Sequence, residues 1–531
     1  MQAARYWPSS TELMPLRTYS ESNLAWPVLP LSKGSVNSQL MPKYVTSVGM
    51  EVHAELLTKS KMFCRCPVAF GGEPNTRTCP VCLGMPGSLP VPNRLAIEMV
   101  IKTALALNCT IAMDSVFHRK NYFYPDLPKG YQVTQYGETN PLGYNGYLEI
   151  SNKDGGTKKV RIRRVHLEED TGKLMHLPAG GAGVDFNRAG VPLMEVVTEF
   201  PPDITGPDEA REYLVQLRHL LLYLRVCDGK MEQGSLRCEP NISIRPEGSE
   251  QYGTKTELKN LNSFRSVQHG VTFEAERQAK IIEGGGKVHQ ETRGWNEGTE
   301  SSYLMRTKET EQDYRYFTCP DLAPMQFDQE YIDGLRESLP ELPLAKKSRF
   351  TRQHGLSETD ADLLVADRSW AEYFEMAVEL GGDPKAVCNW MNSDFARLLN
   401  ETGQAARAQG DDPEGREVSK VTPGHIAGLT ALIDDGTISG KIAKEVFEEV
   451  FRTGTAPRAV VEEKGLTQIS DTTFIENLVD DVIKANPGPV EKYRSGKTGV
   501  LGFLVGQAMK RSQGRANPKI VQDELKKRLE G

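Results

Sequence analysis

The segment Tyr44–His53, with the sequence YVTSVGMEVH, is rich in β-branched residues and opens the first regular pattern of the chain. From Met50 onward, apolar and polar side chains alternate as far as Glu55. Such alternation predicts a β-strand with one buried face. On an extended strand Glu51, His53 and Glu55 project from the same side, about 6.8 Å apart at each step. This stretch therefore predicts either a solvated strand face or a face that holds a metal and a nucleotide.

The residues that follow, up to about Leu339, have the pattern of mixed strands and helices. Leu95–Leu107 carries apolar residues at helical spacing, and Glu209–Leu224 is again helical in pattern. Tyr147–Val165 predicts two strands joined by a turn at Asn152–Gly156. Because strands separated by turns dominate over regular strand–helix alternation, we predict an α+β domain with a mostly antiparallel sheet.

Beyond the prolines of Ser338–Pro343 the pattern becomes almost entirely helical. Asp360–Leu380 and Lys385–Leu399 are amphipathic, and Pro423 follows Thr422 at the first position of a further predicted helix. A polar segment at residues 410–415 suits a linker. We therefore expect an N-terminal extension (1–42), an α+β domain (43–339), a helical domain (340–410) and a small helical tail domain (411–531).

Size and composition set the class of protein. A chain of 531 residues is too long for one core, so two to four domains are expected. No stretch approaches the roughly 20 apolar residues that cross a bilayer, so we expect no contact with a membrane. Nine cysteines without a secretory signal favour a reducing compartment, the cytoplasm.

The charge distribution limits where a nucleic acid could bind. The formal net charge is −7, whereas a nucleic-acid-binding surface is usually basic. From Ala485 to Gly531 there are ten Lys or Arg residues against four Asp or Glu residues. An RNA contact would therefore fall in this tail, unless its basic residues form only a solvated helix face.

The first 40 residues hold Pro, Ser and Asn with isolated aromatics and no sustained period. Three interpretations compete: a disordered arm, an upstream start that the cell does not use, and a transit peptide. Transit peptides are rich in Arg and poor in acidic residues. This segment has two Arg beside Glu12 and Glu21, so we favour the first two interpretations.

Four cysteines form two close pairs in one short stretch. Cys64 and Cys66 are separated by twelve residues from Cys79 and Cys82. Thiolates suit zinc, which accepts four of them tetrahedrally. Free thiols and a redox CxxC pair are the alternatives, and no thioredoxin-like pattern follows to support the second. The spacing favours a closed, structural zinc site.

Further acidic groups accompany the first strand. They occur within Arg163–Lys173, Asp185–Glu195 and Gly253–Ser263, each beside a Lys or Arg. Each alone could be a surface turn. The chain has no Walker-type loop and no kinase signature. If ATP is used, its phosphates must be held through a metal bridged to carboxylates.

The segment Asn121–Gln132 combines dense aromatics with Asn, Lys and Gln. Such a composition suits a pocket that stacks a base or binds a polar substrate. The alternative is a proline-bounded loop whose rings pack on the sheet.

Together these motifs resemble the B subunit family of the tRNA-dependent amidotransferases (the GatB family), from residue 43 to the end. The motifs occur in the expected order: Val48–His53, Lys120–Gln132, His166–Asp170, Lys230–Cys238, Glu257–Ser263, Asp313–Phe317, Gly502–Gln507 and Gly514–Pro518. The resemblance implies a cradle-shaped catalytic domain related to the glutamine synthetase fold, followed by a helical domain and a YqeY-like tail that approaches the tRNA.

The resemblance also implies a reaction and its partners. ATP would phosphorylate the side-chain carboxylate of Glu-tRNA(Gln) or Asp-tRNA(Asn), and ammonia would then displace phosphate. The ammonia would come from an amidase-family glutaminase A subunit, in a heterotrimer with a small C subunit. A non-discriminating aminoacyl-tRNA synthetase is a further partner to consider.

The resemblance assigns roles to residues of this chain. The expected catalytic residues are Glu51, His53, Glu168, Glu169 and Glu257, with Glu51, His53, Glu169 and Glu257 as magnesium ligands. The expected substrate and nucleotide contacts are Tyr124, Lys129, Gln132, Arg188, Glu195, Ser235, Arg237 and Lys259. The expected tRNA contacts are Lys510, Arg511, Arg515 and Lys519, and the expected zinc ligands are Cys64, Cys66, Cys79 and Cys82.

Two rival functions explain part of the sequence. A zinc-containing RNA-binding module without catalysis accounts for the cysteines and the basic tail but leaves the acidic groups without a role. An independent amide ligase for a small acid accounts for the carboxylates but not for the tail.

Overall fold

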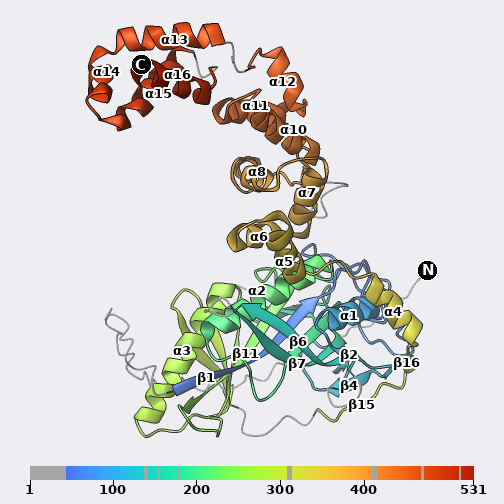
Figure 1. Ribbon diagram of the computed structural model, residues 1–531. Helices are drawn as coiled ribbons and strands as arrows, with labels where there is room; N and C mark the ends of the chain where they lie inside the picture. The colour runs from blue at the N-terminus through green and yellow to red at the C-terminus, as the bar shows by residue number, and fades with distance from the viewer. Residues whose placement is uncertain are drawn as a thin grey trace, which may run out of the picture.

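The computed structural model describes residues 44–136, 141–151, 156–176, 180–307, 314–407, 417–467, 472–512 and 516–530. The predictions for residues 1–42, for most of the turn at residues 152–156 and for the linker at 410–415 therefore lie outside the described residues. Figure 1 shows a large domain of strands and helices from which a helical arm extends to the C-terminal helices.

The first domain is built on a nine-stranded sheet in the order β14-β13-β12-β11-β1-β10-β7-β6-β2. Its strands are β1 (Tyr44–Glu55), β2 (Thr110–Ile111), β6 (Gly143–Ser151), β7 (Thr157–Glu169), β10 (Pro192–Thr198), β11 (Leu236–Pro246), β12 (Thr256–Lys259), β13 (Glu291–Asn296) and β14 (Ser301–Thr307). Neighbouring strands pair antiparallel, except that β12 and β13 are parallel. The predicted mostly antiparallel α+β domain is confirmed.

Three helices cover one face of this sheet: α1 (Arg94–Ala106), α2 (Pro207–Tyr223) and α3 (Phe264–Glu283) (Figure 1). In β1 the alternate residues Val48, Met50, Val52 and Ala54 are buried in the core beneath the helices. Burying a side chain of this size contributes roughly 1.5–3 kcal/mol. The residues between them, including Glu51 and His53, therefore point to the opposite face.

Short strands and one helix complete the domain at one edge. The three-stranded sheet β15-β4-β5 is formed by Phe317–Thr318, His118–Asn121 and Tyr131–Thr134. Two small pairs are β3 (Asp114–Ser115) with β16 (Met325–Gln326), and β8 (Lys173–His176) with β9 (Ala182–Asp185). Helix α4 (Gln329–Glu337) packs beside α1. This arrangement brings residues near 120, 134 and 316 to the end of β7.

The middle of the arm has its own hydrophobic core, which runs from Phe350 to Val461 and also includes Tyr223. Its elements are α5 (Pro343–His354), α6 (Glu358–Val365), α7 (Arg368–Glu379), α8 (Pro384–Trp390), η2 (Met391–Phe395), α9 (Ala396–Thr402), α10 (Pro423–Asp434), α11 (Gly440–Thr453) and α12 (Pro457–Glu463). The predicted helix start at Thr422 and Pro423 is confirmed, because α10 begins at Pro423 with Thr422 as its N-cap.

The amphipathic stretch Asp360–Leu380 forms two helices rather than one. Helix α6 ends at Val365 and α7 begins at Arg368. The break follows from Asp367, whose carboxylate accepts hydrogen bonds from the backbone N–H groups of Ser369 and Trp370. An N-cap of this kind starts a new helix and interrupts the preceding one.

A third core joins α13 (Thr472–Ala485), α14 (Pro487–Arg494), η3 (Thr498–Val500), α15 (Leu501–Arg511) and α16 (Pro518–Glu530). The packing thus divides the arm between residues 461 and 475. The division at 410–411 stays a prediction about domain organisation. Among the described residues, no helix is long and apolar enough to cross a bilayer.

Replacing Phe395 with alanine tests the middle core. The Phe395 ring is fully buried, with its centroid 5.5 Å from that of Trp370, 5.4 Å from Tyr373 and 5.9 Å from Phe447. We expect Phe395→Ala to lower the free energy of unfolding of this domain by about 3–5 kcal/mol, measured by urea denaturation. Leu363→Ala, at a side chain that is 54% exposed, is the control and should cost far less. Equal costs for the two variants would contradict this packing.

Candidate functional site

The face of the sheet opposite α1, α2 and α3 carries charged side chains from five neighbouring strands. Strand register explains this, because residues paired directly across an antiparallel ladder project to the same side. His53 pairs with Glu195 on β10 and with Arg237 on β11, and Glu195 pairs with His166 on β7. We call this surface the polar face. It comprises Glu51, His53, Glu55, His166, Glu168, Glu195, Arg237, Glu239, Asn241, Glu257 and Lys259.

His53, Glu168 and Glu195 form a compact group at the centre of the polar face. Each offers one ligand atom, and these atoms lie within 4.8 Å of one another. His53 Nε2 is 3.7 Å from Glu168 Oε1 and 3.9 Å from Glu195 Oε2. Two carboxylates and one imidazole are a donor set that fits a divalent cation.

Buried His166 supports this group from β7. Its Nε2 lies 2.9 Å from Glu195 Oε2, and its Nδ1 has no hydrogen-bond partner among the described residues. Burial alone would raise the pKa of Glu195, but His166 and His53 hold that pKa well below its usual range. Glu195 is therefore a charged carboxylate in the folded protein, as a metal ligand must be.

A second acidic group lies on the β11 and β12 side of the polar face. Lys259 is ion-paired with Glu239, and its Nζ is 3.1 Å from Glu257 Oε1. Glu51 lies between this group and His53, and Asn241 Nδ2 donates to its Oε1 at 3.0 Å. Burial raises the pKa of Glu51, and the charges of Glu195 and Glu239 raise it further. The carboxylate of Glu51 is therefore a stronger base than that of an exposed glutamate.

Two arginines flank the other end of the polar face. Arg237 Nη2 is 2.7 Å from Asp170 Oδ2, and Arg188 Nε is 3.6 Å from the same oxygen. Burial works against the charge of Asp170, but these guanidinium groups lower its pKa to about 2. Burial and the Asp170 charge raise the pKa of neighbouring Glu55 to about 8. At neutral pH, Glu55 is therefore mostly protonated beside a charged Asp170.

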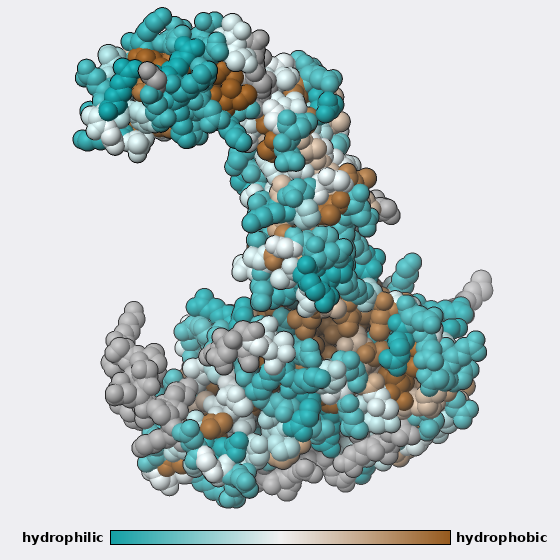
Figure 2. All heavy atoms as spheres, viewed as in Figure 1, coloured by the Kyte–Doolittle hydropathy of each residue, from teal (hydrophilic) through white to brown (hydrophobic). Residues whose placement is uncertain are grey.

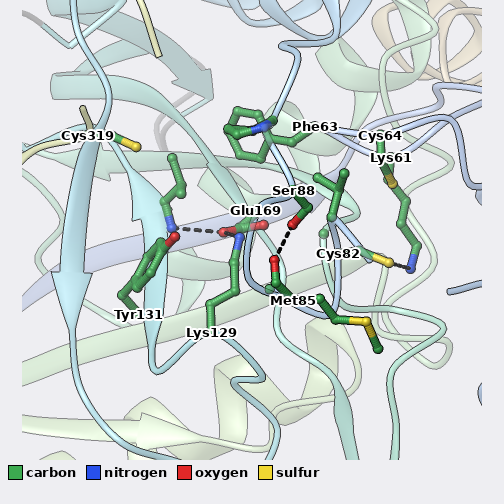
Figure 3. Close-up of a pocket in the computed structure, with 15 residues that line it drawn as sticks. Lys61, Phe63, Cys64, Cys82, Met85, Ser88, Lys129, Tyr131, Glu169 and Cys319 are labelled. Atoms are coloured by element: carbon green, nitrogen blue, oxygen red, sulfur yellow. Dashed lines mark hydrogen bonds and ion pairs between the residues drawn. The ribbon is translucent and has the colours of Figure 1, made fainter. Parts of the chain in front are cut away.

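The structure does not bring Glu169 to the polar face. As the neighbour of Glu168 on β7, it points to the other side of the strand. Its carboxylate is ion-paired with Lys129 and accepts a hydrogen bond from the backbone N–H of Val133 at 2.9 Å. Figure 3 shows Lys129 and Glu169 meeting in a separate pocket, which is also lined by Tyr131 and Cys82. Lys129 is thus ion-paired with Glu169. Of the four predicted magnesium ligands, Glu51, His53 and Glu257 share the polar face, whereas Glu169 lies in the other pocket.

Three other predicted contacts lie outside the polar face. Gln132 is buried and its Nε2 donates to the backbone oxygen of Glu169 at 2.9 Å. Tyr124 is exposed on a loop. Ser235 holds the turn before β11, where its backbone oxygen accepts from the N–H of Glu55. Of the predicted set, Glu51, His53, Glu168, Glu195, Arg237, Glu257 and Lys259 share the polar face.

Sequence reasoning missed His166, Glu239 and Asn241 as members of the polar face. His166 lies two residues before Glu168, so strand alternation could have found it. Glu239 and Asn241 continue the alternation that begins at Arg237 on β11. Lys120 on β4 was also missed, because β4 reaches the end of β7 only through the small sheet.

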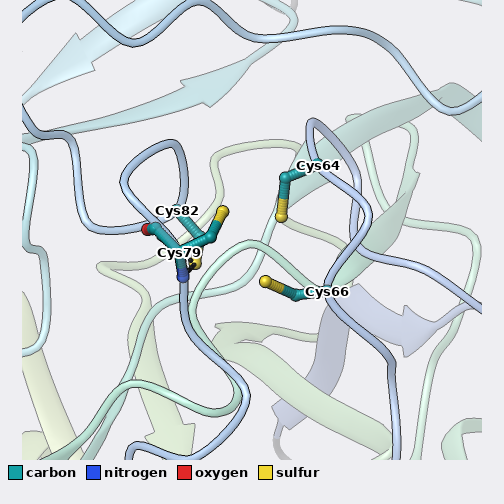
Figure 4. Close-up of side chains that lie close together, drawn as sticks. All are labelled: Cys64, Cys66, Cys79 and Cys82. Carbon is teal, nitrogen blue, oxygen red and sulfur yellow. Dashed lines mark hydrogen bonds between the residues drawn. The ribbon is translucent and has the colours of Figure 1, made fainter.

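The four clustered cysteines converge as the spacing predicts. Figure 4 shows Cys64 and Cys66 facing Cys79 and Cys82 from two loops, and their sulfur atoms lie within 4.8 Å of one another. Sulfur ligands of a tetrahedral zinc lie about 3.8 Å apart, given a Zn–S bond of about 2.3 Å. A hydrogen bond from Cys64, aided by the nearby Lys61 ammonium, lowers the pKa of Cys82 to about 4. The donor set fits zinc.

The predicted tRNA contacts lie at the far end of the arm. Lys510 and Arg511 are exposed at the end of α15, and Lys519 is exposed in the first turn of α16. Arg515 lies outside the described residues. Figure 2 shows mainly hydrophilic side chains over the visible face of these tail helices.

Comparison with known proteins places the chain in a family. Residues 46–333 match the GatB/GatE catalytic domain, and residues 372–529 match the GatB domain. The B subunit of the aspartyl/glutamyl-tRNA(Asn/Gln) amidotransferase of Thermodesulfovibrio yellowstonii is 50% identical, over 92% of this chain and 99% of its own length. The proteins of the same name from Thermoanaerobacter pseudethanolicus and Moorella thermoacetica are each 51% identical, over 92% of this chain and 99% and 100% of their own lengths. With its polar face inside the matched catalytic region, this chain belongs to the GatB family.

Proposed function

We propose that this chain is the B subunit of a tRNA-dependent amidotransferase, which activates the side-chain carboxylate of Glu-tRNA(Gln) or Asp-tRNA(Asn) with ATP. The His53–Glu168–Glu195 group, set among further charges on one face of the sheet, is the observation that carries this proposal. A divalent cation held there, magnesium in the cell, would offset the charge of the nucleotide phosphates. The names of the related proteins support the same reaction.

The chemistry requires activation because a carboxylate oxygen cannot leave as oxide. In the first step a side-chain carboxylate oxygen attacks the γ-phosphorus of ATP, and the bond to the bridging oxygen breaks as ADP leaves with the electron pair. In the second step ammonia attacks the acyl carbon, phosphate leaves and one proton is lost. This catalysis rests on positioning and electrostatic stabilisation.

The residues of the polar face have distinct proposed roles. His53, Glu168 and Glu195 hold the cation, and Glu51 accepts the proton that ammonia loses. Arg237 and Lys259 on the polar face, and Arg188 beside it, would contact phosphate or substrate oxygens in exchange for part of their ion pairs with Asp170, Glu239 and Glu257. Glu257, bound to Lys259 and to Thr292 Oγ1, sets the position of that lysine.

We further propose a heterotrimer in the cytoplasm, with an amidase-family glutaminase A subunit that releases ammonia and a small C subunit. The misacylated tRNA is the substrate, and a non-discriminating synthetase could deliver it. Incubating the complex with Glu-tRNA(Gln), ATP and glutamine, and then measuring Gln-tRNA, tests the proposal. Binding of tRNA without turnover would favour the RNA-binding module, and amidation of free glutamate without tRNA would favour the small-acid ligase.

Replacing Glu195 with glutamine tests the proposed metal group. Removing one ligand charge should weaken binding of Mn²⁺, used as a probe, by at least about tenfold, a cost seen even for residues that only support a ligand. ADP formation with Glu-tRNA(Gln) should fall on the order of 100-fold. Glu149→Gln on β6, at a partly exposed carboxylate that contacts Lys159, is the control. Unchanged Mn²⁺ binding in Glu195→Gln would remove this group from the site.

We propose zinc as the structural ion of the cysteine cluster. The loop that carries the cysteines is mostly exposed between residues 65 and 79, so packing alone stabilises it little. A bound zinc ion would supply on the order of 10 kcal/mol of apparent folding free energy.

Cysteine replacement tests that assignment. The purified wild-type chain should contain one zinc ion, measured by mass spectrometry of the metal content, and Cys79→Ser should lose it because a closed site needs all four thiolates. Cys388→Ser is the control, since Cys388 is buried in the helical core. A zinc content that is the same in Cys79→Ser and wild type would exclude the assignment.

The exposed basic residues of α15 and α16 are proposed to contact tRNA phosphates, which do not report the base sequence. The double variant Lys510→Gln/Arg511→Gln should weaken tRNA binding and lower the slope of log K against log salt by about 0.9 per lost contact. Filter binding at several salt concentrations measures both. Lys464→Gln, at a lysine paired with Glu449 at 3.0 Å, should leave both unchanged. A salt slope equal to that of wild type in the double variant would indicate a solvated helix face.

A further inference from the structure

Lys120 places a positive charge at the end of the polar face. It lies on β4, opposite Gln132 of β5, and on the same side of the strand as His118. His118 in turn pairs with Thr134, whose Oγ1 donates to Glu168 Oε2 at 3.0 Å. Lys120 therefore points to the part of β7 that contributes Glu168 to the His53–Glu168–Glu195 group.

Three tyrosines lie around this lysine, Tyr122, Tyr314 and Tyr316, and Tyr136 packs against Tyr316; we call these four residues the tyrosine wall. Lys120 Nζ is 4.8 Å from the ring centroid of Tyr314 and 5.8 Å from that of Tyr122. The rings contact one another, with centroids 4.6 Å apart for Tyr136 and Tyr316 and 5.9 Å apart for Tyr314 and Tyr316. The rings of Tyr122 and Tyr314 thus cover part of the Lys120 side chain, which is only partly exposed.

The charge of Lys120 lacks a dedicated partner. Among the described residues, no carboxylate is paired with its ammonium group within 4.0 Å. Glu168 is the strongest attractive charge acting on it, and burial opposes that attraction. The same carboxylate also contacts His53 and Thr134. If Glu168 serves a divalent cation, its charge is offset there and Lys120 is left without a counter-charge.

A half-buried cation without a paired carboxylate is stabilised when an anion binds beside it. We propose that Lys120 contacts the transferring phosphoryl group of the nucleotide and stabilises the charge on its oxygens during transfer to the substrate carboxylate. This inference rests on the proposed function. The carboxylate oxygen bonds to the γ-phosphorus, the bond to the bridging oxygen breaks, and ADP takes the electron pair. Lys120 keeps its proton throughout.

The alternative is that Lys120 only positions Glu168. The two roles differ in what they do to metal binding, because a positioning residue would disturb the His53–Glu168–Glu195 group even without nucleotide. A phosphoryl contact instead affects nucleotide binding and transfer and leaves that group intact. Lys120→Met separates them, because it removes the charge and keeps most of the apolar stem against the rings. Lys120→Arg restores a positive charge.

The experiment uses the assembled complex with its partner subunits and has three readouts. These are the affinity for Mn²⁺ alone, the affinity for magnesium with the non-hydrolysable analogue adenylyl imidodiphosphate, and ADP formation with Glu-tRNA(Gln). We expect Lys120→Met to bind Mn²⁺ within twofold of wild type, to bind the analogue about tenfold more weakly and to form ADP about 100-fold more slowly. Lys120→Arg should recover part of both losses.

Lys159→Met is the matched control. Its ammonium lies 3.9 Å from the ring centroid of Tyr147, but the side chain is 58% exposed and far from the polar face along β7. It should match wild type in all three readouts. Thermal unfolding of each variant establishes that it is folded, and should Lys120→Met not fold, Lys120→Gln takes its place.

Three outcomes are decisive. Analogue affinity and ADP formation within threefold of wild type in Lys120→Met would overturn the inference. Loss of Mn²⁺ affinity in the same variant would also overturn it, in favour of the positioning role. A wild-type complex that forms no ADP with either Glu-tRNA(Gln) or Asp-tRNA(Asn) would refute the proposed function instead, and the analogue affinities would still decide whether Lys120 contacts phosphate.

Discussion

The alternation of side chains along β1 is the constraint on which the site depends. Val48, Met50, Val52 and Ala54 lie in the core beneath the helices, so the residues between them are forced onto the other face. Residues that pair across antiparallel strands project to the same side of the sheet, so the partners of Glu51 and His53 on β10 and β11, and the partners of those β10 residues on β7, lie on this face as well. A one-residue slip of β1 would bury Glu51 and His53 and expose the apolar set. The burial of the core therefore fixes the register, and the register assembles the charged residues.

Placing several carboxylates on one face is costly, and the cations around them reduce that cost. Lys259 balances Glu239 and Glu257, while Arg237 and Arg188 balance Asp170. At the centre, Glu168 and Glu195 face two imidazoles and no lysine or arginine ion pair among the described residues. The ends of the polar face are thus neutralised within the chain, whereas the centre is suited to an added cation.

The sequence predicts which kinds of residue form the site, and which residues of one strand share a side, better than it predicts which residues of different strands meet there. The period of two in Met50–Glu55 predicts that Glu51, His53 and Glu55 share a side, and the structure agrees. It cannot decide between Glu168 and Glu169, because that choice depends on the register of β7 against β10, which long-range pairing sets. Lys120 depends on the contact of a separate small sheet with β7. Among the helices, the start of α10 follows from local capping chemistry, whereas the break before α7 depends on one aspartate acting as a cap.

The cysteine loop is connected to the polar face through the segment that leads into β10. The backbone N–H of Met62 donates to Gly190, that of Arg77 to Asn187 Oδ1 and that of Asn75 to Asp185 Oδ1. This segment carries Arg188 and continues directly into the strand of Glu195. A loop of low apolar content cannot hold such contacts in place by packing alone. A metal that cross-links the two cysteine pairs would therefore do more than order a surface loop, because it would fix the segment that positions Glu195 on the polar face and Arg188 beside it.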